Sequence, residues 1–135
     1  MNTDNKLEIN TDKEEYKYKE LTGLVLKSAF EVHNTLGCGF LEKVYERALL
    51  HELKSNKIKA EAQKPKKIIY KGEEVGTYIA DIVIDSKVII ELKTVDFLSL
   101  IHKAQALNYL KASGYEVALI LNFSRPRLEY KRVIR

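Results

Sequence analysis

The stretch YIADIVIDSKVIIELKT, residues 78–94, has the pattern of two apolar β-strands joined by a tight turn. Three charged residues interrupt the apolar runs, namely Asp81, Glu91 and Lys93. Charged side chains inside buried strands lose hydration, so they need partners that compensate for the loss. The pattern therefore predicts a buried hairpin, and the three charges within it indicate a chemical role.

The register of this hairpin decides where the charges fall. With a three-residue loop at residues 85–87, Asp81 lies directly opposite Glu91. Because side chains alternate between the two faces of a strand, Lys93 shares the face of Glu91. A two-residue loop would instead offset the two carboxylates by one position. We expect the opposite face to be core throughout, with Ala80, Ile82, Ile84, Val88, Ile90 and Leu92.

Two opposed carboxylates repel each other, and a divalent cation would relieve that repulsion. Carboxylate oxygens are hard ligands that suit Mg²⁺ or Mn²⁺. Such an ion would bridge Asp81 and Glu91, and the backbone carbonyl of Leu92 could add a third ligand. Lys93 would then point at whatever the metal holds, most naturally a phosphate. The alternative is that Glu91 and Lys93 form a local ion pair without any metal.

A helix predicted over residues 40–56 adds further carboxylates. Glu42 borders the apolar stripe of this helix and can reach inward, and Glu46 follows one turn later. Both carboxylates could instead pair with Lys43 and Arg47 at the surface.

A helix predicted over residues 97–113 carries His102, Gln105 and Tyr109 on one face. A helix usually meets a sheet with aliphatic side chains, so these polar groups suggest a role in orienting Lys93 or gripping a phosphate. The alternatives are a surface or hydrogen-bonded role for His102, and a core position with a hydrated hydroxyl for Tyr109.

The rest of the chain completes one domain of α/β class, a mixed sheet with helices packed on it. A length of 135 residues fits one modest core. We expect residues 1–20 to be a flexible arm and residues 21–135 to be the domain. The expected elements are helices at 21–35, 40–56 and 97–113, the last ended by Gly114, and strands at 66–70, 74–84, 87–94, 115–123 and 128–135, the last at an edge.

The composition indicates where the protein acts and what it could bind. The apolar runs are too short to cross a membrane, and the polar N-terminus has no apolar segment typical of a secretory signal. The single Cys38 excludes an internal disulfide, so we expect a cytoplasmic protein. The net charge of +4 comes with clustered basic residues that suit a phosphate backbone, although solvated surface is the alternative. The candidates for such contacts are Lys66, Lys67, Arg125 and Arg127.

Together these motifs resemble the PD-(D/E)xK nuclease superfamily and, within it, the small bacterial group of GxxExxY proteins. The resemblance covers residues ~21 to 135. One departure is Ala80, which stands where the pattern has a proline before the aspartate. The matching motifs are Gly39-Phe40-Leu41-Glu42-Lys43-Val44-Tyr45, then Asp81 with Glu91-Leu92-Lys93, then the Gln-x-x-x-Tyr of RecB-like nucleases as Gln105-Ala106-Leu107-Asn108-Tyr109.

The resemblance implies a restriction-endonuclease-like αβββαβ core with a divalent-metal site, Mg²⁺ or Mn²⁺, at one end of the central sheet. It implies hydrolysis of phosphodiester bonds, with DNA as the favoured substrate. The implied roles are metal binding by Asp81, Glu91 and the Leu92 carbonyl, completion of the site by Glu42, positioning or deprotonation of the attacking water by Lys93, and support of Lys93 and the substrate by Gln105 and Tyr109.

Two other functions are compatible with the same fold. The protein could be a nucleic-acid-binding module without turnover, or a protein-interaction module. A domain of this size has little room for separate sequence recognition, so specific cleavage would need a homodimer or a protein partner.

Overall fold

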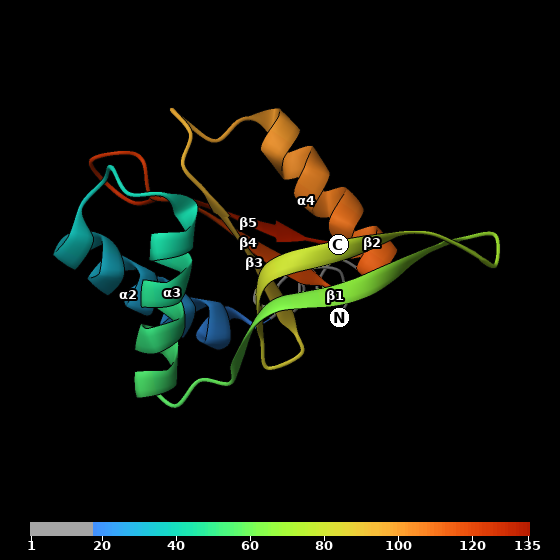
Figure 1. The fold of residues 1–135 in the computed structure, drawn as a ribbon, viewed down its shortest axis with the longest axis horizontal. Coiled ribbons are helices and arrows are strands. Elements are labelled where there is room, and N and C mark those ends of the chain that lie inside the picture. The colour runs from blue at the N-terminus through green and yellow to red at the C-terminus, as the bar shows by residue number, and fades with distance from the viewer. Residues whose placement is uncertain (1–17) are drawn as a thin grey trace, which may run out of the picture.

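The computed structural model describes residues 18–135, and its helices and strands follow one another in the order predicted from the sequence (Figure 1). They are α2 (Lys19–Leu36), α3 (Glu42–Ser55), β1 (Ala60–Tyr70), β2 (Glu73–Ile84), β3 (Val88–Lys93), α4 (Leu100–Ser113), β4 (Val117–Asn122) and β5 (Glu129–Ile134).

The five strands form one sheet in the order β1-β2-β3-β4-β5. β3 and β4 are parallel, and the other neighbours are antiparallel. The predicted mixed sheet is therefore confirmed, and β5 lies at its edge as expected. The parallel pair needs a crossover connection, and α4 supplies it.

Helices cover both faces of the sheet, with α2 and α3 on one side and α4 on the other (Figure 1). Each side has its own apolar cluster, which is why the strands at the centre have no polar face. The α2–α3 side buries, among others, Val25, Tyr45, Leu49, Ile82, Ile90 and Leu119. The α4 side buries Ala80, Val83, Ile89, Ala118, Ile120 and Leu110.

Strands β1 and β2 form a long hairpin whose far end projects beyond the rest of the sheet (Figure 1). β2 pairs with β3 only over Ile82–Ile84 and Val88–Ile90, so the earlier part of β2 has β1 as its neighbour. The three-residue loop at residues 85–87 is confirmed, because Ile84 pairs with Val88. Asp85 and Ser86 occupy the left-handed region, with φ of 51° and 54°.

The predicted alternation of faces along β2 is wrong at one point. Ala80 packs on the α4 side together with Tyr78, whereas Ile82 and Ile84 pack on the α2–α3 side. The alternation is therefore interrupted around Asp81. The strand opposite is distorted at the same level, where Ala62 pairs with Ile82, Lys64 pairs with Ala80 and the intervening Gln63 has a φ of 52°.

Some boundaries also differ from prediction. β1 begins at Ala60 and runs through Pro65, which an edge strand tolerates because a missing N–H costs little there. α4 begins at Leu100 rather than residue 97, because Ser99 takes the N-cap position. Gly114 ends α4 in the left-handed conformation, with a φ of 85°, as expected.

The predicted N-terminal arm falls largely on residues 1–17, which lie outside the described residues. Residues 19 and 20 belong to α2. No helix in the described part of the chain combines the length and the apolar character needed to cross a membrane.

Candidate active site

The candidate site lies where β2 and β3 separate, and we call this place the fork. The backbone ladder between the strands ends at Ile82 and Ile90. Beyond it, side chains make the bridges: Asp81 Oδ2 accepts a hydrogen bond from the Leu92 N–H at 2.8 Å, and the Tyr78 hydroxyl donates to Glu91 Oε1. The fork thus holds two carboxylates in place of backbone pairing.

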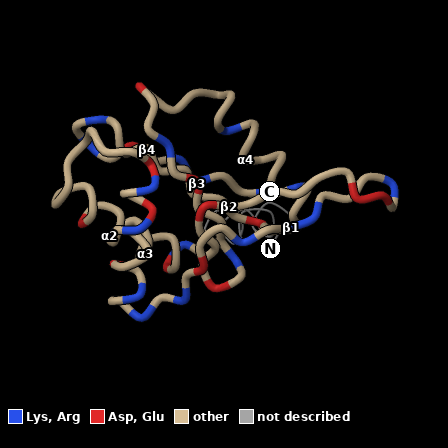
Figure 2. Tube along the Cα trace, viewed as in Figure 1, with Lys and Arg blue, Asp and Glu red and all other residues tan. Residues whose placement is uncertain are grey.

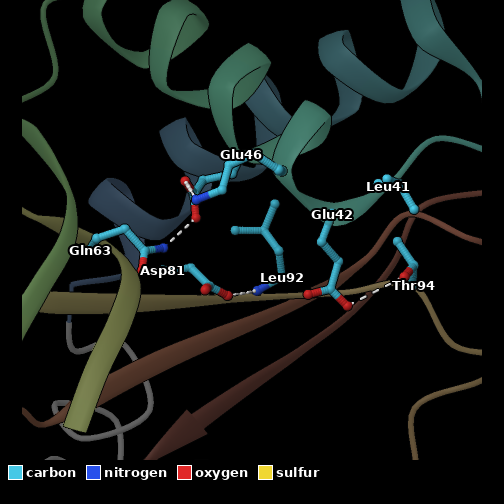
Figure 3. Close-up of a pocket in the computed structure, with 8 residues that line it drawn as sticks. Leu41, Glu42, Glu46, Gln63, Asp81, Leu92 and Thr94 are labelled. Carbon is cyan, nitrogen blue, oxygen red and sulfur yellow. Dashed lines mark hydrogen bonds and ion pairs between the residues drawn. The ribbon is translucent and has the colours of Figure 1, made fainter. Parts of the chain in front are cut away.

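On the α3 side, the fork opens into a pocket of about 460 Å³ (Figure 3). Glu42, from the first turn of α3, lies across it and accepts a hydrogen bond from the Thr94 hydroxyl at 3.3 Å. The structure therefore brings Glu42 to the same pocket as Asp81, although the two are far apart in the sequence. The pocket is lined by Leu41, Glu42, Lys43, Glu46, Gln63, Asp81, Leu92 and Thr94.

Glu46 also reaches this pocket, and it is buried rather than solvent-facing. Its Oε1 accepts a hydrogen bond from Gln63 Nε2 at 2.6 Å, and its Oε2 pairs with Lys43 at 3.0 Å (Figure 3). An ion pair of Glu46 with Lys43 is one of the alternatives that the sequence left open. The contact with Gln63 was missed, because nothing in a strand pattern indicates that Gln63 would take a positive φ and turn toward α3.

The segment before α3 is held by Tyr45. The Tyr45 hydroxyl donates to the Gly37 carbonyl at 2.6 Å and accepts from the Phe40 N–H at 3.3 Å. Its ring is fully buried and stacks on Phe123, with ring centroids 4.5 Å apart. Gly39 has a φ of 113°, which other residues rarely adopt. The glycine and the tyrosine therefore fix the backbone that presents Glu42.

On the α4 side, Glu91 and Lys93 line a small cavity with His102, Gln105 and Tyr109. The structure thus brings the lysine together with the polar face of α4, as the sequence indicates. Gln105 is exposed, whereas Glu91 is buried and Lys93 is half-buried.

His102 has a structural role. Its Nδ1 accepts a hydrogen bond from the Ser99 N–H at 3.0 Å, which completes a capping box at the start of α4. The neutral ring then carries its proton on Nε2. Of the alternatives that the sequence left open for His102, the hydrogen-bonded role is the one that the structure shows.

Asp81 and Glu91 do not share one face as expected, because Asp81 lines the α3-side pocket and Glu91 lines the α4-side cavity. The interruption of alternation at Asp81 is the physical reason. In the chain, Leu92 stands between Glu91 and Lys93, which line the α4-side cavity, whereas Leu92 itself lines the α3-side pocket. Since the Lys93 carbonyl faces β4, where it accepts from the Phe123 N–H at 3.0 Å, the N–H and carbonyl of Leu92 both face the fork.

Burial, with a smaller contribution from neighbouring carboxylates, raises the pKa values of Asp81 and Glu91. The pKa of Asp81 is raised, first by burial and then by repulsion from Glu46 and Glu42, against the hydrogen bond from Leu92. Burial also raises the pKa of Glu91 from 4.5 to about 7, where Asp81 and Glu42 add to the effect and the Tyr78 hydrogen bond opposes it. A cation would reverse these shifts.

The donors at the fork suit a hard divalent cation in type, since Asp81, Glu91, Glu42 and the Leu92 carbonyl are all oxygen ligands. The fit in position is partial. Among residues 18–135, no three His, Cys, Asp or Glu side chains converge closely enough to hold a metal ion as they stand. The observation that favours a cation is the chemistry of the donor set, because buried Glu91 and the Asp81 carboxylate meet on either side of Leu92, and Glu42 enters the pocket of Asp81.

The segment between β3 and α4 is fixed by buried Asn122 at the end of β4. Asn122 Nδ2 donates to the Val95 carbonyl at 2.9 Å and to Glu129 Oε1 at 3.0 Å, and its Oδ1 accepts from the Val95 N–H at 3.1 Å. Glu129 Oε1 also accepts from the Leu98 N–H at 2.8 Å. No pattern in the sequence indicates this network, which fixes the backbone at Val95 and Leu98.

The four basic residues named as candidate phosphate contacts are not one patch. Lysines and arginines gather along the β1–β2 hairpin and, separately, on the turn before β5 (Figure 2). Lys66 lies over the Tyr115 ring at 5.5 Å, and Lys67 Nζ is 3.8 Å from Glu74 Oε2. Arg125 Nη1 donates to the Asp96 carbonyl at 3.0 Å, and Arg127 is exposed.

Comparison with known proteins identifies the superfamily and the fold. The model of a family described as the PD-(D/E)XK nuclease superfamily matches residues 19–133, and the chain belongs to that superfamily. A solved structure, "Crystal structure of SSO0001", shares the fold with a TM-score of 0.53 at 24% identity. The similarity covers 90% of this chain and 60% of that one. A search of curated proteins found no match.

Proposed function

We propose that the protein is a divalent-metal-dependent nuclease that hydrolyses phosphodiester bonds in DNA. The observation that carries the proposal is the fork, where Asp81 and Glu91 flank Leu92 and both have raised pKa values. Lys93 follows on the same strand and lines the cavity of Glu91. Superfamily membership supports the same reaction class.

The oxygen ligands for the cation would be Asp81, Glu91, the Leu92 carbonyl and Glu42. A bound Mg²⁺ or Mn²⁺ would supply Lewis-acid stabilisation of the charge that develops on the phosphate. Lys93 would orient the attacking water, accept its proton or offset the developing negative charge. Gln105 and Tyr109 would support Lys93 and the substrate from α4.

We also infer that the chain belongs to the GxxExxY group of this superfamily. Gly39, Glu42 and Tyr45 stand at the positions of that motif, and each has a distinct physical task here. Gly39 supplies a backbone conformation with positive φ, Tyr45 ties the segment down, and Glu42 enters the pocket.

The nucleic acid would contact basic residues in two separate places. Lys66 and Lys67 on the projecting hairpin, and Arg125 and Arg127 on the turn before β5, would contact phosphates on either side of the cut. With so small a domain, a second copy or a protein partner would supply any sequence specificity.

A cleavage assay tests the proposal. Single-stranded, duplex and branched DNA, and RNA, would be incubated with Mg²⁺ or Mn²⁺ and either the wild type or Asp81→Ala. We expect cleavage of at least one DNA by the wild type and none by the variant. Binding in a gel shift with no cleavage by the wild type would favour the non-catalytic binding module instead, and neither binding nor cleavage would favour the protein-interaction module.

A further inference from the structure

We propose that Tyr78 is a positioning residue that holds the Glu91 carboxylate ready for the divalent cation. This inference rests on the metal site proposed above. Tyr78 belongs to none of the motifs that point to the site, and it lies three residues before Asp81 in β2.

The contact is direct and crosses the fork. The Tyr78 hydroxyl donates to Glu91 Oε1, although the backbones of β2 and β3 have already separated at this level. On its other side, Tyr78 is paired in the ladder with Lys66 of β1. Tyr78 is therefore fixed by β1 and reaches across to Glu91 of β3, which pairs with Ile120 of β4 but has no backbone partner in β2.

The position of the hydroxyl is fixed by packing. Tyr78 is 6% exposed and belongs to the apolar cluster on the α4 side. Its ring stacks on Tyr109, with centroids 4.2 Å apart and an interplanar angle of 18°. Because rotation of the ring would break this stack, the hydroxyl is held in one position. The carboxylate oxygen that it binds is held there with it.

The bond engages one of the two carboxylate oxygens of Glu91. Within the described part of the chain, the hydrogen bond found for Glu91 uses Oε1. Glu91 is 8% exposed and lines the α4-side cavity beside Lys93, so its carboxylate borders an open space. One oxygen is thus anchored in a group that lies at the edge of the core.

Carboxylates that bind metals are commonly held by such hydrogen bonds, and loss of the holding group weakens metal binding roughly 10–100-fold. A glutamate has several rotatable bonds, and fixing them before binding lowers the entropy cost of adding the metal. The Tyr78 hydroxyl holds the carboxylate of Glu91 in this way, and the Leu92 N–H holds the carboxylate of Asp81.

The test is a direct titration of Mn²⁺, followed by electron paramagnetic resonance, into the metal-free wild type, Tyr78→Phe, Asp81→Ala and Tyr130→Phe. Tyr78→Phe keeps the ring and removes the hydroxyl. We expect its Mn²⁺ affinity to fall roughly 10–100-fold. Tyr130→Phe removes a hydroxyl from a partly exposed tyrosine of β5 and should bind Mn²⁺ as the wild type does.

The outcomes separate this inference from the proposed function. Equal or tighter Mn²⁺ binding by Tyr78→Phe, with binding lost in Asp81→Ala, would overturn the role of Tyr78 alone; tighter binding would make Tyr78 a restraint on Glu91. No binding by the wild type would overturn both. Circular dichroism and urea unfolding of each metal-free variant at the titration temperature show whether it is folded, so weak binding by a folded Tyr78→Phe supports the proposal.

Discussion

Glu91 is held in a place where its charge is unfavourable. Its side chain is 8% exposed, and burial raises its pKa from 4.5 to about 7. A carboxyl group with a raised folded-state pKa contributes stability below its unfolded pKa and loses that contribution as the pH rises through the folded value. The metal-free protein should therefore lose stability between about pH 4.5 and pH 7, and Asp81 acts in the same direction.

Glu91→Gln should remove the contribution of Glu91 to this pH dependence and leave that of Asp81. The neutral amide has no charge to bury and keeps an oxygen that can accept from Tyr78. Relative to the wild type, we expect the variant to gain on the order of 2–3 kcal/mol in free energy of unfolding between pH 4.5 and pH 8. Urea unfolding in the presence of EDTA at the two pH values measures it. Glu73→Gln, at an exposed position of β2, is the matched control.

If the two proteins kept the same difference in stability at both pH values, Glu91 would not carry a raised pKa in the folded state. The unfavourable burial of a charge at the fork would then have no support. In contrast, a gain in free energy of unfolding that is present with EDTA and absent with Mg²⁺ would show that the cation offsets the cost of burying the charge of Glu91.

At the residue scale, sequence reasoning found the charged residues because they interrupt apolar runs. Asp81, Glu91 and Lys93 are visible for that reason. Their exact relation was not visible, since the period of two assumes an undistorted strand, and the alternation of faces changes at Asp81. Tyr78 was missed because a tyrosine in a strand reads as an ordinary β-forming residue.

At the element scale, the start of α3 is the part of the fold that delivers a carboxylate to the pocket. Helix α3 has no side-chain hydrogen bond at its N-cap, Leu41. The preceding segment is instead tied by the Tyr45 hydroxyl to Gly37 and Phe40. Glu42 lies in the first turn, where a carboxylate also interacts favourably with the helix dipole.

Tyr45→Phe should loosen this segment while leaving the stacked ring in place. The Gly37 carbonyl and the Phe40 N–H lose a partner, so we expect a loss of about 1–2 kcal/mol in free energy of unfolding. Urea unfolding measures the loss, and hydrogen exchange at the Phe40 amide shows whether it is local. Unchanged exchange at Phe40 would contradict the role assigned to Tyr45, and Tyr130→Phe should change stability by no more than about 0.5 kcal/mol.

The elements themselves were largely predictable, because helical and strand periods are strong signals in this chain. Helices α2 and α3 follow their apolar stripes, and Gly114 ends α4. The long β1 was predicted too short, since Pro65 reads as a strand boundary and an edge position in the sheet cannot be seen from the sequence. The late start of α4 follows from the side chain of His102, whose capping contact has no periodic signature.

At the scale of the whole molecule, a cation at the fork should couple to folding. A ligand that binds only the folded state stabilises it by about 2.7 kcal/mol when its concentration is 100 times its Kd. We therefore expect Mn²⁺ or Mg²⁺ at millimolar concentration to raise the Tm of the wild type, and Asp81→Ala to abolish that rise. Differential scanning calorimetry with and without EDTA measures it, and an equal rise in both proteins would move the metal elsewhere.

The projecting β1–β2 hairpin should contribute to nucleic-acid binding through charge. Removing Lys66 and Lys67 together by substitution with alanine should weaken binding to DNA and reduce the slope of log affinity against log salt by roughly 1–2. Fluorescence anisotropy across a salt series measures the slope. Lys27→Ala, on the exposed face of α2, is the control, and an unchanged slope in the double variant would exclude the hairpin from the contact surface.

The whole fold was predictable because the order of elements and three separate motifs agree with one architecture. The relative placement of the basic clusters was not, because it depends on how far the β1–β2 hairpin projects (Figure 2).

The most direct test of the account compares Mg²⁺-dependent cleavage of labelled DNA by three proteins purified identically: the wild type, Lys93→Ala and Lys87→Ala. Lys87 lies in the loop of the same hairpin and is exposed, so it controls for loss of a lysine. We expect cleavage by the wild type and Lys87→Ala that stops with EDTA, and none by Lys93→Ala. Equal cleavage by Lys93→Ala, or none by the wild type, would contradict a metal-dependent nuclease at the fork.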